Sequence, residues 1–237
     1  MKTWYVEIAG DRAEIGELAT DLTDASCSID IGDDRILLSS DRFETCTTPA
    51  EVLKQAEIVV EALNGVAKLT LAVPQPIRLT HRVIEVSPDG TRRSHVLASA
   101  HSHAMFRMKA TLTGVGIDGL PIPPQESFAT LAMRLGKTHS SIHRALDHYG
   151  EGTWGSFYKV FEIIREDVGD EPALQERGWV NWEHLKRFTR DAQAEGAAGK
   201  EARHAGSQYR SSSHPMRKGE ASDLIGRLLR AWIESQR

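Results

Sequence analysis

The residues best suited to chemistry in this sequence lie in a basic segment near its C-terminus. Between residues 186 and 218, eight lysines and arginines face only three acidic residues, although the whole chain has a formal charge of −4. Within this segment Arg203 stands beside His204, and His214 lies further along. An arginine can hold a phosphate while a histidine exchanges protons near neutral pH, and RNA cleavage by a 2′-hydroxyl needs both tasks. The segment therefore predicts catalytic roles for Arg203, His204 and His214.

The same segment suits nucleic-acid binding without any reaction. Lysine and arginine contacts with phosphates supply most of the sequence-independent affinity of proteins for nucleic acids. A structural interpretation stays open, in which these side chains pair with acidic residues or cap helix ends. The residues that we expect to contact nucleic acid are Lys186, Arg187, Arg190, Arg203 and Arg210.

Histidines elsewhere in the chain offer a second kind of chemistry. His139, His143 and Asp147 stand at intervals of four residues, which places them on one face of a helix and suits a divalent metal. His101 and His103 lie between expected strands, and alternation would put both imidazoles on the same side of a strand. A solvated polar face explains each group, so we expect no metal site and no cofactor.

The clearest element that could position the basic segment is a helix between Thr153 and Gly169. Thr153 can cap its start and Gly169 can end it in a left-handed turn. Ten of the fifteen aromatic residues lie from Tyr149 onward, so this helix should anchor a core together with Leu228 and Trp232 of the last helix. Its apolar stripe consists of Trp154, Phe157, Phe161, Ile164 and Val168.

Strand patterns dominate the first part of the chain and helical patterns the rest. Alternation and turn sequences predict strands at 4–9, 28–31, 35–39, 77–86, 92–99 and 104–112, with a further short strand at 43–46. One helix begins with a capping box at Thr48 and Glu51, and the Asn64-Gly65 pair predicts its end. We therefore expect an α+β fold. It consists of an N-terminal β-rich α+β domain (1–113), a linker rich in glycine and proline (114–124) and a C-terminal helical bundle (125–237).

Composition narrows the class of protein. No window approaches the roughly 18 apolar residues of a membrane span, and the N-terminus lacks the pattern of a signal peptide. Two cysteines, Cys27 and Cys46, make no disulfide framework, and the count alone allows two thiols or one bridge. We prefer two thiols and expect a cytoplasmic protein. Its expected partners are RNA or a nucleotide, or another protein, with a homodimer as one form.

Several stretches of the C-terminal half carry a resemblance to known proteins. The runs TWGSFYKVFEIIREDVG and GWVNWEHLKRFTRDAQ, with ARHAG after them, resemble the C-terminal region of a widespread set of uncharacterised bacterial proteins. More loosely, a helical bundle with such a motif before its last long helix is similar to HEPN domains. Their motif is arginine, a polar residue, three variable residues and histidine. Arg203 and His204 match the first two positions, Gln208 stands where the histidine belongs, and His214 lies further on.

Two functions emerge as hypotheses. The resemblance implies an RNA- or nucleotide-interacting protein of a bacterial stress or antiphage defence system, since HEPN domains are often ribonucleases. The alternative is a non-catalytic protein-interaction or dimerisation scaffold, because some HEPN domains have no activity.

The catalytic hypothesis predicts RNA cleavage that needs no metal. Arg203→Ala should abolish cleavage, because the arginine charge stabilises the developing negative charge on the phosphate. The measurement is incubation of labelled RNA with the wild-type and variant proteins, each with and without EDTA. RNA that stays intact under every condition would contradict the catalytic roles.

Overall fold

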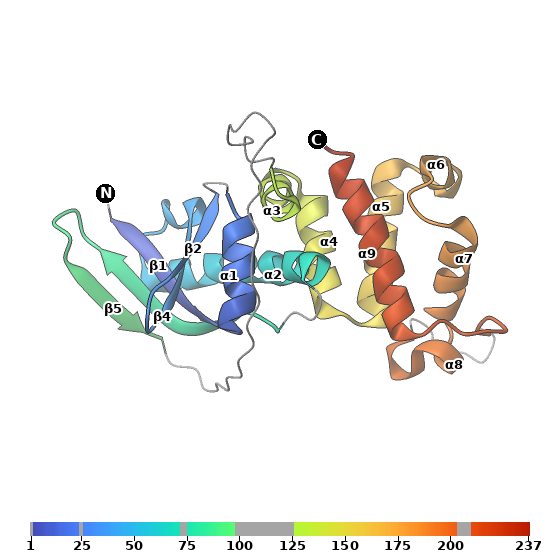
Figure 1. Cartoon of the computed structure of the whole chain (residues 1–237), viewed down its shortest axis with the longest axis horizontal. Helices are drawn as coiled ribbons and strands as arrows, with labels where there is room; N and C mark the ends of the chain where they lie inside the picture. The colour runs from blue at the N-terminus through green and yellow to red at the C-terminus, as the bar shows by residue number, and fades with distance from the viewer. Residues whose placement is uncertain (1, 24–25, 72–74, 98–125, 203–209) are drawn as a thin grey trace, which may run out of the picture. The chain divides into compact units, whose positions relative to one another are not determined.

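The structure, a computed structural model, describes residues 2–23, 26–71, 75–97, 126–202 and 210–237 (Figure 1). Its contacts divide the chain into two units. The first, here called the sheet unit, comprises Met1–Leu63 and Thr70–Arg134, and the helical unit comprises Asn64–Leu69 and Leu135–Arg237. The predicted linker at 114–124 lies outside the described residues, so the predicted domain boundary stays a prediction.

In the described part of the sheet unit, five antiparallel strands form one sheet in the order β2-β3-β1-β4-β5 (Figure 1). Alternation along the central strand buries Trp4, Val6 and Ile8 on one face. Five of the predicted strands are confirmed to within a few residues. Their bounds are β1 (Thr3–Ala9), β2 (Cys27–Ile31), β3 (Ile36–Ser40), β4 (Arg78–Val86) and β5 (Arg92–Val96). The short strand predicted at 43–46 is wrong, because the chain forms a 3-10 helix at Asp41–Phe43 instead. The strand predicted at 104–112 lies outside the described residues.

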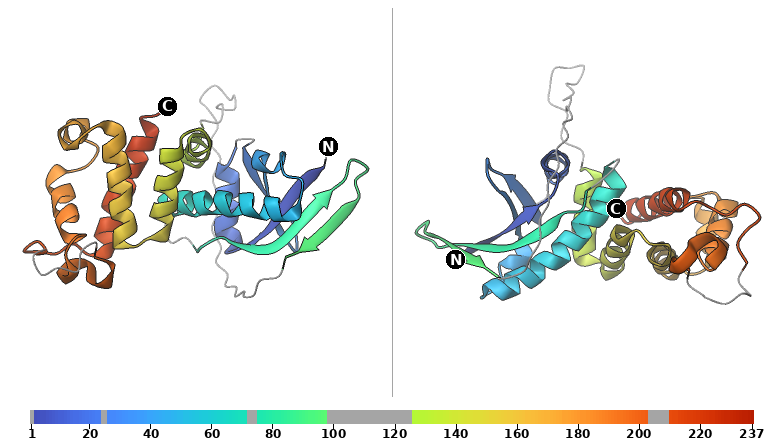
Figure 2. Two further views of the ribbon diagram at one scale, coloured as in Figure 1. Left: turned by 180° about the vertical axis from the view of Figure 1, so that it is seen from behind. Right: turned by 90° about the horizontal axis from the view of Figure 1, so that it is seen from below.

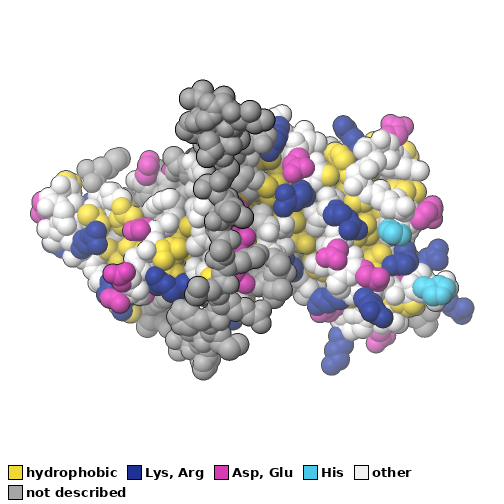
Figure 3. Space-filling model, in the orientation of Figure 1, with side chains coloured by type: hydrophobic (Ala, Val, Ile, Leu, Met, Phe, Trp, Pro, Cys, Tyr) yellow, Lys and Arg dark blue, Asp and Glu magenta, His cyan; other side chains and the backbone are white. Residues whose placement is uncertain are grey.

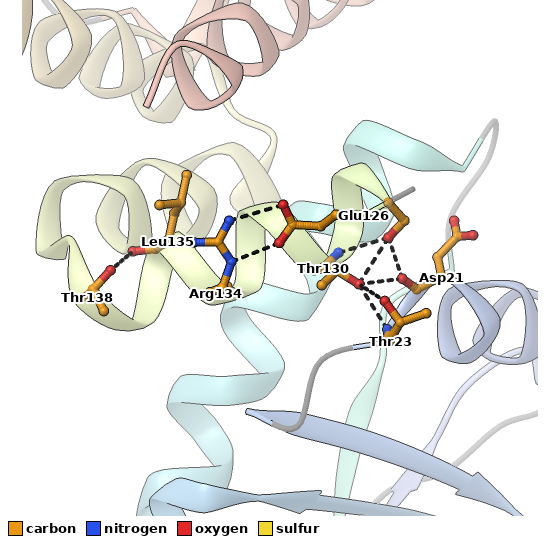
Figure 4. Close-up of polar contacts among 8 residues, drawn as sticks. Asp21, Thr23, Glu126, Thr130, Arg134, Leu135 and Thr138 are labelled. Carbon is orange, nitrogen blue, oxygen red and sulfur yellow. Dashed lines mark hydrogen bonds and ion pairs between the residues drawn. The ribbon is translucent and has the colours of Figure 1, made fainter. Parts of the chain in front are cut away.

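Helix α1 (Arg12–Asp21), most of α2 (Pro49–Thr70) and the first residues of α3 (Phe128–Thr138) complete the sheet unit, while Asn64–Leu69 of α2 belong to the helical unit. The start of α3 is joined to the end of α1 by hydroxyl groups (Figure 4). The Thr130 hydroxyl donates to the Asp21 carbonyl at 2.7 Å and accepts the Thr23 N–H at 2.9 Å. These bonds satisfy backbone groups at the end of α1 that have no partner within that helix.

The helical unit contains the remaining helices, and Figure 2 shows α5 and α9 lying side by side. The predicted core is confirmed, because Trp154, Phe161, Leu228 and Trp232 are each at most 3 % exposed. The predicted cap of α5 is also present, with the Thr153 hydroxyl accepting the Ser156 N–H at 3.0 Å. The helices are α4 (Ser140–Glu151), α5 (Trp154–Val168), α6 (Glu171–Arg177), α7 (Trp182–Asp191), α8 (Glu195–Ala198) and α9 (Lys218–Glu234).

The α+β class is therefore as predicted, with a sheet near the N-terminus and helices after it. Cys27 and Cys46 are both free thiols, as preferred. Within the described residues, no helix combines the length and the apolar character needed to cross a membrane.

The predicted end of α2 at Asn64-Gly65 is wrong, because the helix continues to Thr70. A Cβ atom at Gly65 would lie 2.2 Å from the carbonyl oxygen of Leu146 in α4, so the missing side chain lets the two helices touch through their backbones. Val66 and Ala67 are buried beyond this contact. Burial of this last part of the helix outweighs the cost of about 1 kcal/mol for a glycine within a helix.

Gly65→Ala should destabilise the helical unit, because a methyl group there overlaps backbone that no side-chain rotation can move. Overpacking a close-packed site typically costs about 1–3 kcal/mol or more, and we expect the upper end of that range. The measurement is urea unfolding, monitored by circular dichroism. Gly219→Ala in α9 is the matched control, because its Cβ would meet nothing within 4 Å. Equal stability of the two variants would contradict the close approach.

Candidate functional site

Helix α7 presents a stripe of one aromatic and two basic side chains. Trp182, Lys186 and Arg190 stand at intervals of four residues, so they lie along one side of the helix. Lys186 and Arg190 are exposed, and Trp182 is partly exposed. The opposite side anchors the helix in the core through Leu185, Phe188 and Asp191.

Asp191 is an ionisable residue within this buried face, with 0 % of its surface exposed. Its carboxylate accepts the Ser212 N–H at 2.7 Å, the Ser212 hydroxyl at 3.0 Å and the Met216 N–H at 2.7 Å. A buried carboxylate needs such partners, because leaving it without them costs several kcal/mol. Asp191 therefore fastens the chain segment 210–217 to the end of α7.

The hydrogen bonds between Asp191 and Ser212 fix the position of a segment that contains two of the predicted site residues. Arg210 and His214 are exposed on either side of Ser212. The His214 Nδ1 lies 3.2 Å from the Ser213 hydroxyl, and the His214 carbonyl, at 2.9 Å, shares the single Ser212 hydroxyl hydrogen with Asp191. Arg203 and His204 lie outside the described residues, so the catalytic roles predicted for Arg203, His204 and His214 stay a prediction.

The carboxylates near the basic residues are largely engaged in holding the fold. Glu201 accepts the Trp154 N–H at 2.9 Å at the start of α5 and the Lys218 ammonium at 2.8 Å. The bond from Lys218, and next the bond from Trp154, lower the pKa of the Glu201 carboxyl from its ordinary value of 4.5. Glu220 likewise accepts the Arg217 N–H at 2.8 Å at the start of α9.

The predicted basic residues differ in how far they are neutralised. Lys186 pairs with Glu183 at 2.7 Å, and Arg187 lies 3.6 Å from Glu220. Arg190 and Arg210 form no ion pair with any carboxylate in the described part of the chain. Their charges are therefore available to an anionic partner. The term basic surface denotes Lys186, Arg187, Arg190 and Arg210.

A groove of about 680 Å³ lies elsewhere on the helical unit, along α4 and α5. Cationic side chains alternate there with two glutamates, so the groove has no dominant charge. Arg165 in its wall stacks on Phe161, with 5.5 Å from the guanidinium carbon to the ring centre. The lining residues are Arg144, His148, Lys159, Glu162, Ile163, Arg165, Glu166 and Gly169.

The groove adjoins a cluster of potential metal ligands at the end of α4. One ligand atom from each of Asp147, His148 and Glu151 lies within 4.8 Å of the others. The His148 Nδ1 and the Glu151 carboxylate already bind each other at 2.8 Å. This is not the group that the spacing suggested, because Asp147 is gathered with its neighbours rather than with His139 and His143. All three ligands come from one helix, and within the described residues the group has no fourth member.

Sequence reasoning missed Asp191, which organises the site. In the charge pattern of the basic segment this residue is simply one of three acids. The sequence could have indicated its role, because Asp191 stands three residues after Phe188, on the apolar side of α7. An acidic residue at that position must find hydrogen-bond donors inside the core.

No protein-family model matches this chain, and no curated protein or solved structure shows significant similarity to it.

Asp191→Ala should release the segment 210–217, since the Ser212 and Met216 N–H groups lose their acceptor. Each unsatisfied buried donor costs about 1–3 kcal/mol, so the free energy of unfolding should fall by at least about 2 kcal/mol. The measurements are urea unfolding and the rate of tryptic cleavage after Arg210 and Arg217, which should rise. The control is Asp223→Ala on the exposed surface of α9. Unchanged cleavage rates in the Asp191 variant would refute the fastening role.

Proposed function

We propose that this protein binds RNA through the basic surface of its helical unit. The observation that carries the proposal is the burial of Asp191. This carboxylate lies within the sequence of the basic surface but points into the core, where it accepts hydrogen bonds from Ser212 and Met216. Among the residues that the structure describes, it therefore leaves the arginines around it, Arg190 and Arg210, without an ion-pair partner.

The surrounding surface supports binding of a polyanion rather than of a small neutral ligand. Lysine and arginine side chains are numerous over α7, α8 and α9, with acidic side chains between them (Figure 3). When such cations neutralise phosphates, counterions are released, and the resulting affinity falls steeply with salt. Arginine is also suited to phosphate because its planar guanidinium can donate two parallel hydrogen bonds.

The HEPN-like hypothesis adds cleavage to this binding. In that version Arg203 holds the scissile phosphate while His204 or His214 moves the proton, within a bacterial stress or antiphage defence system. Binding through the basic surface requires none of these three residues, so the two parts of the proposal are tested separately. If no RNA binds, the protein-interaction scaffold is the function that remains.

The test is fluorescence anisotropy of labelled RNA with the full chain at several salt concentrations. Wild-type protein should bind at low salt, with affinity falling as salt rises. Arg190→Ala and Arg210→Ala should each weaken binding and reduce the slope of log affinity against log salt by about one.

The matched control is Arg144→Ala, which removes one exposed arginine from the groove on α4 and α5. It should leave both affinity and salt slope close to wild type. An equal loss from Arg144→Ala would move the interface to the groove, and the absence of binding to any RNA or DNA would overturn the proposal altogether.

A further inference from the structure

Two tryptophans stand apart from the rest because they are not buried. Trp4, Trp154 and Trp232 are each no more than 4 % exposed. Trp179 and Trp182, at the turn between α6 and α7, are both partly exposed. Indole rings usually bury most of their surface in a core or an interface, so two partly exposed rings within four residues need an explanation.

Positive charge lies beside the Trp179 ring and further along the helix that Trp182 begins. The Arg177 guanidinium carbon is 5.7 Å from the centre of the Trp179 ring. Gly178 between them has a φ of 63°, the left-handed conformation that turns the chain at the end of α6. Trp182 begins the α7 stripe that continues with Lys186 and Arg190. That stripe rises about 12 Å from the tryptophan to the last arginine.

We propose that single strands of RNA cross this surface, with bases stacked on Trp179 and Trp182 and phosphates on Lys186 and Arg190. This inference rests on the proposed function and specifies its substrate as unpaired nucleotides. Base stacking on aromatic side chains, combined with a basic track for the backbone, is how proteins bind single strands without reading their sequence. In a duplex the base faces already stack on each other, so they are not available to stack on the indole rings.

The arrangement favours a nucleic acid over an acidic protein. The carboxylates of an acidic peptide would pair with the cations but have no aromatic face to place on the indole rings. The interval between Trp182, Lys186 and Arg190 also places an aromatic side chain next to phosphate-binding charge, which suits the alternation of base and phosphate along a strand. A second copy of this chain would cover the rings without needing the charges.

The experiment is intrinsic tryptophan fluorescence of the full chain, titrated with an unstructured single-stranded RNA and with a blunt RNA duplex of the same length. Since Trp4, Trp154 and Trp232 are buried, quenching by stacked bases reports on Trp179 and Trp182. The single strand should quench strongly and bind at least about 5-fold more tightly than the duplex. Equal affinity for the two RNAs would overturn the inference.

Substitutions then separate stacking from charge. Trp182→Leu should weaken single-strand binding by about 5-fold or more and leave the salt slope unchanged. Trp182→Phe, which keeps an aromatic face, should restore most of the affinity. Trp179→Leu, outside any helix, repeats the test where helix packing is not disturbed, and thermal melts establish that each variant is folded.

The outcomes distinguish failure of this inference from failure of the proposed function. If Arg190→Ala weakens binding while both leucine variants bind like wild type, stacking is wrong and RNA binding stands. If no RNA binds at all, both are wrong. If sedimentation shows a dimer that Trp182→Leu dissociates without changing the RNA affinity of the chain, the rings serve a dimer interface and the inference is wrong.

Discussion

The helical unit depends on the close approach of two helix backbones at Gly65. Helix α4 passes so near to α2 that a Cβ atom at Gly65 would lie 2.2 Å from the Leu146 carbonyl oxygen. Gly150, one turn further along α4, also faces Gly65, with 3.3 Å from its Cβ position to the Gly65 nitrogen. Since both positions lack side chains, the two helices meet through main-chain atoms. Lys68 then reaches the Tyr149 carbonyl at 3.1 Å and satisfies a group at the end of α4.

From this crossing a series of aromatic contacts leads to the basic surface. The Tyr149 ring lies 5.7 Å from Phe157, and Trp154 stacks on Phe188 of α7 at 6.0 Å. The Tyr149 hydroxyl also donates to the Ser222 carbonyl of α9 at 3.1 Å. Close packing of this kind transmits displacements, because protein cores have little free volume. The orientation of α7 and its exposed stripe is thereby fixed by contacts far from the surface itself.

Local signals in the sequence predict the elements well, and tertiary contacts account for what they miss. The cap at Thr153 and the aromatic stripe of α5 are readable because each depends on residues within a few turns. The Asn64-Gly65 pair has the local form of a helix end, but its true role depends on Leu146, which is far away in the sequence. The charge of the basic segment can be counted, but its pairing cannot, since Glu183 and Glu220 lie outside the segment and pair with Lys186 and Arg187.

The arrangement of the acids explains why a nearly neutral helical unit can carry a basic surface. Asp191, Glu201 and Glu220 each accept hydrogen bonds from backbone N–H groups, at Ser212, Trp154 and Arg217. Glu201 and Glu220 do so at helix starts, where a negative charge also offsets the helix dipole. Lysines and arginines cannot accept these bonds and so remain at the surface. The requirement that backbone donors be satisfied thus buries the Asp191 charge and engages Glu201 and Glu220 at helix starts, while the arginines and lysines remain at the surface. A phosphate backbone could use that separation of charge without any residue having to change its role in folding.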